Sequence, residues 1–184
     1  MTDRLFFSDD FTNGLDPSWT WLREEPSLWR LDNGGLEICV QPGKADTVIN
    51  ALLCDAPDRK AGFAVEVTVY NHTMPVEQYE QAGITLYVDG LPVFKLVKEL
   101  IDGDLYIIPG KQPMSMQSVR LRLLVTADSW EAQYRPQGAT GFSTADSGDL
   151  IAGEKTQVSL QCYNGPKHSD HWIRFEDLQI SKLT

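Results

Sequence analysis

The chain has 184 residues, of which 42% are hydrophobic, the composition of an ordinary globular protein large enough to bury one core. Its 26 acidic and 16 basic residues give a formal net charge of −10, which argues against binding to nucleic acid or to an anionic membrane. No apolar run has the length of a membrane span and no secretory signal precedes the first strand-like residues, so we expect a cytoplasmic protein.

The first third of the chain alternates strand-like segments with turns. Strands are expected at residues 5–7, 19–24, 28–32, 36–41, 48–54 and 63–70. The clearest turn is Asn33-Gly34-Gly35, because glycine tolerates the positive φ that a tight hairpin requires.

The middle of the chain holds a β-hairpin signal. Residues 80–88 and 93–100 alternate in polarity with period two, and the turn dipeptide Asp89-Gly90 separates them. One face of the first run carries Ala82, Ile84, Leu86 and Val88, which predicts that this face points into a core. The opposite face carries polar side chains.

The last third continues in the same way. Strands are expected at residues 105–108, 119–126, 130–135, 156–163 and 172–182. Residues 137–148 are small and polar and are predicted to form an exposed loop, and residues 143–152 are compatible with a single helical turn. About a dozen short strands with almost no helical periodicity predict an all-β fold of two stacked antiparallel sheets.

The cysteines and tryptophans have structural interpretations. Cys39, Cys54 and Cys162 are an odd number at wide spacing, each in an apolar run, which favours buried, reduced thiols over disulfides or a metal site. Trp19, Trp21 and Trp29 would form a platform for a sugar or a partner if exposed, but their alternating positions in strands favour the core.

Several separated segments carry a resemblance to a known family. They are Phe7-Ser8-Asp9-Asp10-Phe11, Leu15-Asp16-Pro17, Trp29-x-Leu31, Gly35-Leu36-x-Ile38, Glu80-Gln81-Ala82-Gly83-Ile84 and Arg174-Phe175-Glu176-Asp177. In these segments the chain resembles a concanavalin A-like family of poorly characterised proteins that includes those named regulation of enolase protein 1. It is also similar to the C-terminal β-sandwich domain of certain β-xylosidases.

The resemblance implies that residues 1–184 form a single lectin/glucanase-type domain, a jelly-roll sandwich with one concave sheet. It does not imply one activity, because this fold carries lectins, glycosidases and accessory domains alike. The family name implies a regulatory link to a glycolytic enzyme. No residue in the sequence speaks for or against that link.

Polar side chains on the outward face of the central sheet form the candidate binding site. They are Gln81, Thr85, Tyr87, Lys95, Glu99, Arg122 and Gln133. If their strands are neighbours, amides, charges of both signs and an aromatic ring converge on one surface, which is the chemistry of sugar recognition. The alternative is an ordinary solvated sheet face.

Catalysis and metal binding have weaker support. A glycosidase needs two carboxylates across a cleft. The resemblance implies that they would lie on one strand in a Glu-x-Asp-x-(x)-Glu run, which this sequence lacks. The remaining possibility is that Glu80 or Glu99 meets Glu131 across strands. The segment His168-Ser169-Asp170-His171 lacks a third metal ligand at sensible spacing. Folds of this type often hold a structural calcium, for which Asp9 and Asp177 are the candidates, although turn hydrogen bonds explain Asp9 more simply.

We therefore expect a non-catalytic domain, without cofactor or metal, that binds a carbohydrate through the concave sheet. The alternatives are a glycoside hydrolase with cross-strand carboxylates and a protein–protein interaction module linked to glycolytic enzyme regulation. Neither nucleic acid nor a membrane is expected as a partner.

Overall fold

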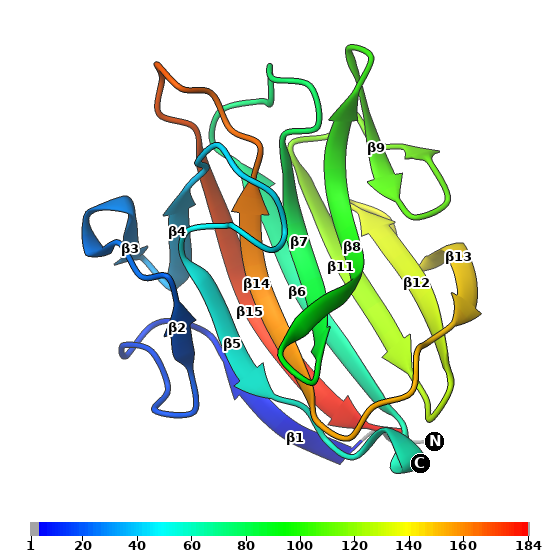
Figure 1. Ribbon diagram of the computed structural model, residues 1–184. Helices are drawn as coiled ribbons and strands as arrows, with labels where there is room; N and C mark the ends of the chain where they lie inside the picture. Colours follow the sequence, from blue (N-terminus) through cyan, green and yellow to red (C-terminus); the bar gives the residue numbers. More distant parts are fainter. Residues whose placement is uncertain (1–3, 184) are drawn as a thin grey trace.

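The computed structural model describes residues 4–183, which form two stacked antiparallel sheets (Figure 1). The strands of the eight-stranded sheet A are β13 (Ser143–Asp149), β12 (Ser129–Pro136), β11 (Ser118–Val125), β6 (Phe63–Asn71), β15 (Trp172–Lys182), β4 (Gly35–Cys39) and β3 (Trp29–Asp32), in spatial order, with β1 (Arg4–Asp9) also paired to β15. The seven-stranded sheet B has the order β10 (Gln112–Pro113), β9 (Asp104–Ile108), β8 (Leu91–Ile101), β7 (Gln81–Val88), β14 (Thr156–Tyr163), β5 (Ala51–Asp55) and β2 (Thr20–Leu22). Two short 3-10 helices, η1 (Pro26–Leu28) and η2 (Arg59–Ala61), complete the elements. The prediction of an all-β sandwich is confirmed.

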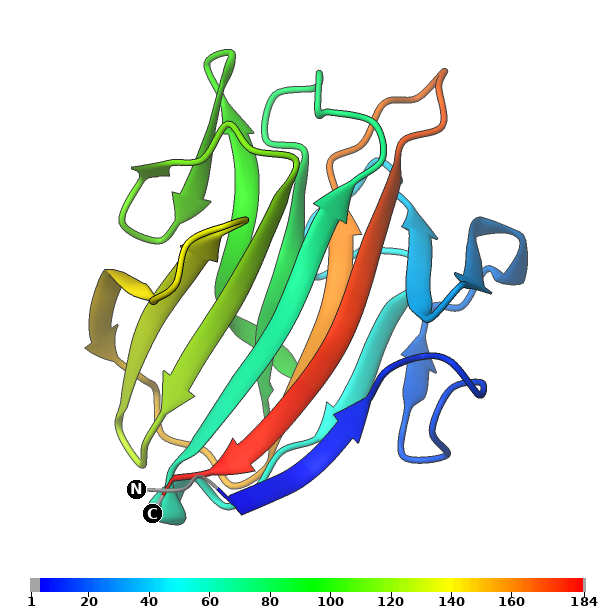
Figure 2. The same cartoon turned by 180° about the vertical axis from the view of Figure 1, so that it is seen from behind.

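The core lies between the sheets and is built by the period-two alternation of each strand. In β6, Val65, Val67 and Val69 are fully buried in the core, as are Ile84 and Leu86 in β7. Side chains of successive strand residues point to opposite faces, so every second residue of these strands enters the core. Viewed from behind, sheet A covers this core as one broad layer (Figure 2).

Tight turns with left-handed backbone fix the hairpins. Asp89 and Gly90 have φ of 51° and 82° between β7 and β8, and Asn33 and Gly34 have φ of 44° and 74° between β3 and β4. Positive φ at both central residues matches the right-handed twist of the flanking strands. Both hairpins were expected from the turn residues, and both are confirmed.

The region expected as an exposed loop after β12 contains a strand instead. Residues 143–149 form β13, which pairs with β12 at the edge of sheet A. The ring of Trp130 packs against Gly148, where a Cβ would lie 2.8 Å from the ring. An edge strand is held by backbone hydrogen bonds on one side only, so its small polar residues need no alternating apolar pattern. The predicted loop is confirmed for residues 137–142 and wrong for residues 143–148, and the helical turn considered at residues 143–152 is wrong as well.

The cysteines and tryptophans behave as expected. Cys39, Cys54 and Cys162 are buried and free, and burial raises the pKa of the Cys54 thiol to about 12. Trp19 belongs to the core, while Trp21 and Trp29 pack against it with ring centroids 4.8 Å apart. In the part of the chain from residue 4 to 183, no helix is both long and apolar enough to cross a membrane.

One lysine occupies a core-facing position that the hydrophobic pattern does not mark. Lys98 pairs with Ala82 across β7 and β8 and is 2% exposed. Its ammonium donates to Asn71 Oδ1 at 2.9 Å and to the backbone carbonyls of Met116 and Gln117. Three oxygen acceptors hold the charge at the rim of the core, yet burial still lowers the pKa of Lys98 to about 8.

This buried ammonium predicts a pH dependence of stability. The pKa of Lys98 is lower in the folded chain, so unfolding takes up a proton between pH ~8 and pH ~10.5, and the free energy of unfolding rises with pH in that range. We expect wild type to gain about 2 kcal/mol relative to Lys98→Met between pH 7.5 and 10 in urea unfolding. A Lys95→Met variant should show the same rise in the free energy of unfolding with pH as wild type. An equal pH dependence in wild type and Lys98→Met would contradict the assignment of the rise to Lys98.

Candidate functional site

Five of the seven side chains predicted to form the site lie on one face. Gln81, Thr85 and Tyr87 come from β7, and Lys95 and Glu99 come from β8. The register pairs Gln81 with Glu99 and Thr85 with Lys95, so these side chains share the outer face of sheet B. Residues of the opposite parity enter the core, which fixes the direction in which the five point.

The other two predicted residues lie elsewhere. Arg122 in β11 and Gln133 in β12 face each other on the outer surface of sheet A, and Arg122 Nε lies 3.3 Å from Glu66 Oε1. The expectation that they would join the other five is wrong. Alternation along a strand shows which of its residues share a face, but it does not show to which of two sheets the strand belongs.

A hydrogen-bonded triad of Gln81, Lys95 and Glu99 lies on the outer face of sheet B. Lys95 Nζ donates to Gln81 Oε1 at 2.7 Å and to Glu99 Oε2 at 2.9 Å. Gln81 Nε2 donates to Glu99 Oε1 at 3.2 Å and to the carbonyl of Tyr79 at 2.8 Å. Gln81 and Glu99 are buried, whereas 33% of the Lys95 side chain is exposed. Lys95 is therefore the member of the triad that solvent, or a ligand, meets first.

The neighbouring part of the outer face, on β7 and β14, contains polar groups of which two have no partner. Tyr87 Oη donates towards Gln161 Oε1 at 3.1 Å, and Ser159 Oγ lies 3.0 Å from the same oxygen. Gln161 Nε2 and Thr85 Oγ1 are buried and have no hydrogen-bond partner among residues 4–183. A buried polar atom without a partner costs about 1–3 kcal/mol. Thr85 Oγ1 and Gln161 Nε2 therefore keep hydrogen-bonding capacity that no described residue uses.

Ser159 and Gln161 are functional candidates that the predicted site left out. They stand on the polar side of β14, next to β7 in sheet B. The alternation of β14 with period two marks them as outward residues. The missing information was that β14 pairs with β7.

The segment between β4 and β5 covers part of the outer face. Figure 1 shows it passing in front of sheet B. Arg23 Nε donates to the carbonyl of Val48 at 2.6 Å, and Tyr87 Oη lies 3.2 Å from the carbonyl of Ala45. Val48 and Tyr87 also pack with three other side chains in a small second cluster, whose members are Val48, Ala51, Leu53, Tyr87 and Tyr163. Tyr87 is thus 2% exposed and does not form the floor of an open groove.

A hollow of about 390 Å³ lies at the β2, β5 and β14 side of sheet B. Thr20, Leu53, Asp55, Lys155 and Gln157 are among its lining residues. Asp55 Oδ1 accepts from Gln157 Nε2 at 2.9 Å and lies 3.1 Å from Lys155 Nζ. The hollow combines an apolar wall with an amide and both signs of charge, and its volume is within the range of small-ligand sites.

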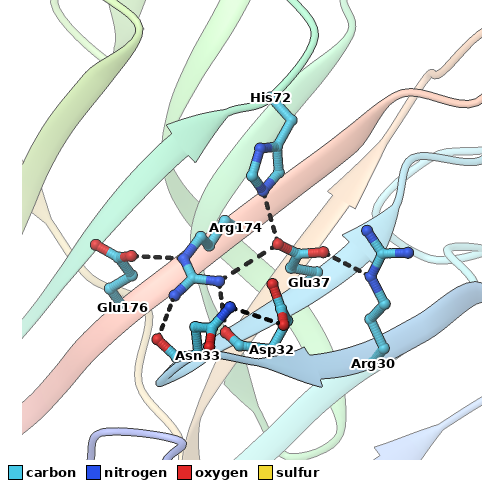
Figure 3. Close-up of polar contacts among 7 residues, drawn as sticks. All are labelled: Arg30, Asp32, Asn33, Glu37, His72, Arg174 and Glu176. Carbon is cyan, nitrogen blue, oxygen red and sulfur yellow. Dashed lines mark hydrogen bonds and ion pairs between the residues drawn. The ribbon is translucent and has the colours of Figure 1, made fainter.

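The outer face of sheet A carries a second polar cluster, centred on Glu37 (Figure 3). Glu37 is 1% exposed; its Oε2 lies 2.6 Å from Arg30 Nε, and its Oε1 lies 2.7 Å from His72 Nε2 and 3.3 Å from Arg174 Nη1. Burial alone would raise the pKa of Glu37, but hydrogen bonds from Arg30 and His72 outweigh burial and lower that pKa. The guanidinium of Arg30 also lies 4.3 Å from the ring centre of Trp172.

The same cluster ties the β3–β4 hairpin to β15. Arg174 donates to the carbonyls of Asp32 and Asn33 in the turn at 2.6 and 2.8 Å. A Cβ on Gly35 would lie 2.3 Å from the guanidinium carbon, so the arginine fits only because residue 35 is glycine. Both carboxylate oxygens of Glu37 have cationic or imidazole partners, which indicates a structural role for this cluster.

The carboxylates proposed for catalysis do not come together. Glu131 is in β12 of sheet A, whereas Glu99 is on the outer face of sheet B. Glu80 is fully buried; its Oε1 lies 2.7 Å from His171 Nδ1, and its Oε2 accepts from the backbone N–H groups of Val76 and Glu77. A cross-strand pair of Glu131 with Glu80 or Glu99 is therefore wrong.

The proposed metal ligands have other partners. Asp9 Oδ1 accepts from Phe11 N at 2.7 Å, and Asp9 Oδ2 accepts from Asp16 N and Trp19 Nε1. These are the turn hydrogen bonds expected as the alternative to calcium. Among the residues that the structure describes, no group of three or more His, Cys, Asp or Glu side chains is placed to hold a metal ion.

Comparison with solved structures shows the fold. The GH43 protein BlXynB from Bacillus licheniformis matches with a TM-score of 0.73 at 17% identity, over 96% of this chain and 39% of that one. A xylan beta-1,4-xylosidase from Bacillus halodurans matches with a TM-score of 0.71 at 14% identity, over 95% and 39%. The chain thus spans about two-fifths of the length of these proteins.

A third structure is matched over its whole length. It carries the description "Prominent members of the human gut microbiota express endo-acting O-glycanases to initiate mucin breakdown" and has a TM-score of 0.65 at 10% identity, over 98% of this chain and 100% of that one. No family model matches the chain, and no curated protein matches its sequence. At these identities the likeness establishes a β-sandwich fold shared with GH43 proteins.

The Glu37 cluster predicts acid sensitivity. The pKa of Glu37 is lowered in the folded chain. The ionised carboxylate therefore adds to the free energy of unfolding above the unfolded pKa of ~4.3, and this contribution is lost as the pH falls below that value. We expect Glu37→Gln to lower the free energy of unfolding by about 1–3 kcal/mol at pH 7, and the difference from wild type to shrink towards pH 3.

Urea unfolding at pH 7, 5 and 3 measures this difference. Glu176→Gln is the matched control, because Glu176 also contacts Arg174 but its side chain is 41% exposed, so a smaller loss is expected. A difference in the free energy of unfolding between wild type and Glu37→Gln that stays constant from pH 7 to pH 3 would contradict the stabilising role of the ionised Glu37.

Proposed function

We propose that this domain, formed by residues 1–184, binds a carbohydrate through the outer face of sheet B and has no catalytic activity of its own. The observation that carries the proposal is the set of buried polar groups on that face. Gln81, Lys95 and Glu99 bond to one another, while Thr85 Oγ1 and Gln161 Nε2 remain unpaired. Buried polar groups without a partner are unusual in folded proteins, and the partly exposed ammonium of Lys95 offers donors to the hydroxyl groups of a ligand.

An aromatic surface adjoins the triad. Tyr106 in β9 pairs directly with Glu99, so its half-buried ring lies on the same outer face, where Lys111 Nζ lies 5.0 Å from the ring centre. Sugar rings pack their C–H surfaces on aromatic rings while their hydroxyls bond to amides and charges. Tyr106 and Lys95 together therefore supply both parts of a sugar subsite.

The structural neighbours support the choice of ligand. Two of them are described as a GH43 protein and a xylan xylosidase, and a third description concerns O-glycanases. The resemblance to proteins named regulation of enolase protein 1 supports the alternative, in which this face binds a protein. The triad and Tyr106 favour the carbohydrate.

The proposal predicts that binding depends on residues of sheet B. We expect a glycan array followed by calorimetry to identify a ligand among xylo-oligosaccharides, gluco-oligosaccharides and mucin-type O-glycans. Tyr106→Ala and Lys95→Met should each weaken binding about 5- to 30-fold, the equivalent of about 1–2 kcal/mol, because they remove the ring contact and the exposed donor.

Gln133→Ala is the matched control, because it removes an amide from the outer face of the other sheet. It should bind as wild type does. Absence of any glycan ligand, or binding that Gln133→Ala weakens and Tyr106→Ala leaves unchanged, would refute the proposal. A protein captured on this face with Lys95-dependent affinity would also refute it and would favour the interaction-module alternative.

A further inference from the structure

A second hollow, of about 770 Å³, lies at one end of the sandwich. Its walls come from the segment between β5 and η2, from η2 itself, from the β11–β12 turn and from the segment leading into β14. In Figure 1 these segments meet at the lower end of the molecule. The volume is within the range of sites for small molecules.

A buried arginine without a counter-charge lines this hollow. Arg59 is 7% exposed; its Nη1 donates to the carbonyl of Ile151 at 2.9 Å and its Nη2 donates to the carbonyl of Gly153 at 2.8 Å. No carboxylate within residues 4–183 forms an ion pair with it. Two carbonyls orient the guanidinium but leave its charge uncompensated, and three of its five N–H groups remain available.

A buried hydroxyl without a partner lines the same hollow. Thr156 is 7% exposed, and its Oγ1 has no hydrogen-bond partner in the described chain. A buried polar atom normally has one, so the pairing that Thr156 lacks is available to a ligand. This observation is independent of the charge on Arg59.

The other charged groups of the hollow are exposed. Asp58 Oδ1 accepts from the backbone N–H of Lys60 at 3.0 Å, and Asp55 pairs with Lys155 at 3.1 Å. Glu154 is exposed. Arg59 and Lys60 have no carboxylate partner among the described residues, and Asp58 and Glu154 have no cationic one. Of these four charges only that of Arg59 is buried, so it is the charge that solvent screens least.

We infer that this hollow binds an oxyanion, either a carboxylate or a phosphate group of a small ligand. The free N–H groups of Arg59 and the ammonium of Lys60 supply charge and donors, and the Thr156 hydroxyl donates one further hydrogen bond. Guanidinium groups match the geometry of both anions. The inference does not depend on carbohydrate binding at the outer face of sheet B.

The test is titration of the full chain with inorganic phosphate and, separately, with glucuronate, followed through amide NMR signals at constant ionic strength. We expect saturable shifts at Gly153 and Thr156 with at least one of the two. Phosphate alone indicates a phosphorylated ligand, and glucuronate alone indicates an acidic sugar. Either result supports the inference.

Three variants make the test specific. Thr156→Val keeps the shape of the side chain and removes only an unpaired hydroxyl, so it should fold as stably as wild type and bind about 5- to 10-fold more weakly. Lys60→Met should also bind more weakly. Lys167→Met, an exposed lysine in the segment before β15, should bind as wild type does. Amide shifts no larger than those caused by sodium chloride would overturn the inference. Equal affinity of Thr156→Val and wild type for phosphate or glucuronate would overturn it as well.

Discussion

The burial of β7 and β14 on both faces is the constraint from which the rest of the structure follows. Their inward residues complete the core between the sheets, which any antiparallel sandwich requires. Their outward residues are buried as well, because a covering segment and a second small cluster lie over them. Polar side chains placed there must bond to each other or to something that enters the face, since water cannot reach them freely.

The two outer faces meet this demand differently. On sheet A, the buried Glu37 is satisfied by Arg30, His72 and Arg174, and the product is a rigid link between the β3–β4 hairpin and β15. On sheet B, the triad around Lys95 is complete but its neighbour Gln161 is not. A fully satisfied network stabilises a structure, whereas a buried group without a partner, such as Gln161 Nε2, costs free energy.

The sequence predicted the sandwich and its faces because both depend on local patterns. Alternation placed Ile84 and Leu86 in the core and Gln81 outside it, and Asp89-Gly90 fixed the hairpin that aligns Gln81 with Glu99. What local patterns lack is the order of strands in space. Arg122 was therefore assigned to the wrong sheet, because period-two alternation is the same on both.

Other features lay outside sequence patterns for related reasons. The cover over Tyr87 depends on the path of a loop, and β13 depends on a free edge at β12. Lys98 occupies a core position because carbonyl groups from a distant loop receive its ammonium. The contacts of Tyr87 and Lys98 join residues that are well separated in the chain, and the alternation of a single strand does not record them. β13 pairs with its neighbour in sequence, but its small polar residues carry no strand pattern.

Carbohydrate binding at the outer face of sheet B is tested most directly by a map of amide NMR shifts on addition of xylohexaose to the intact chain. If that face binds the sugar, the largest changes lie at Lys95, Glu99 and Tyr106. Changes concentrated in β6, β11, β12 and β15 of sheet A, with none at these three residues, would contradict it.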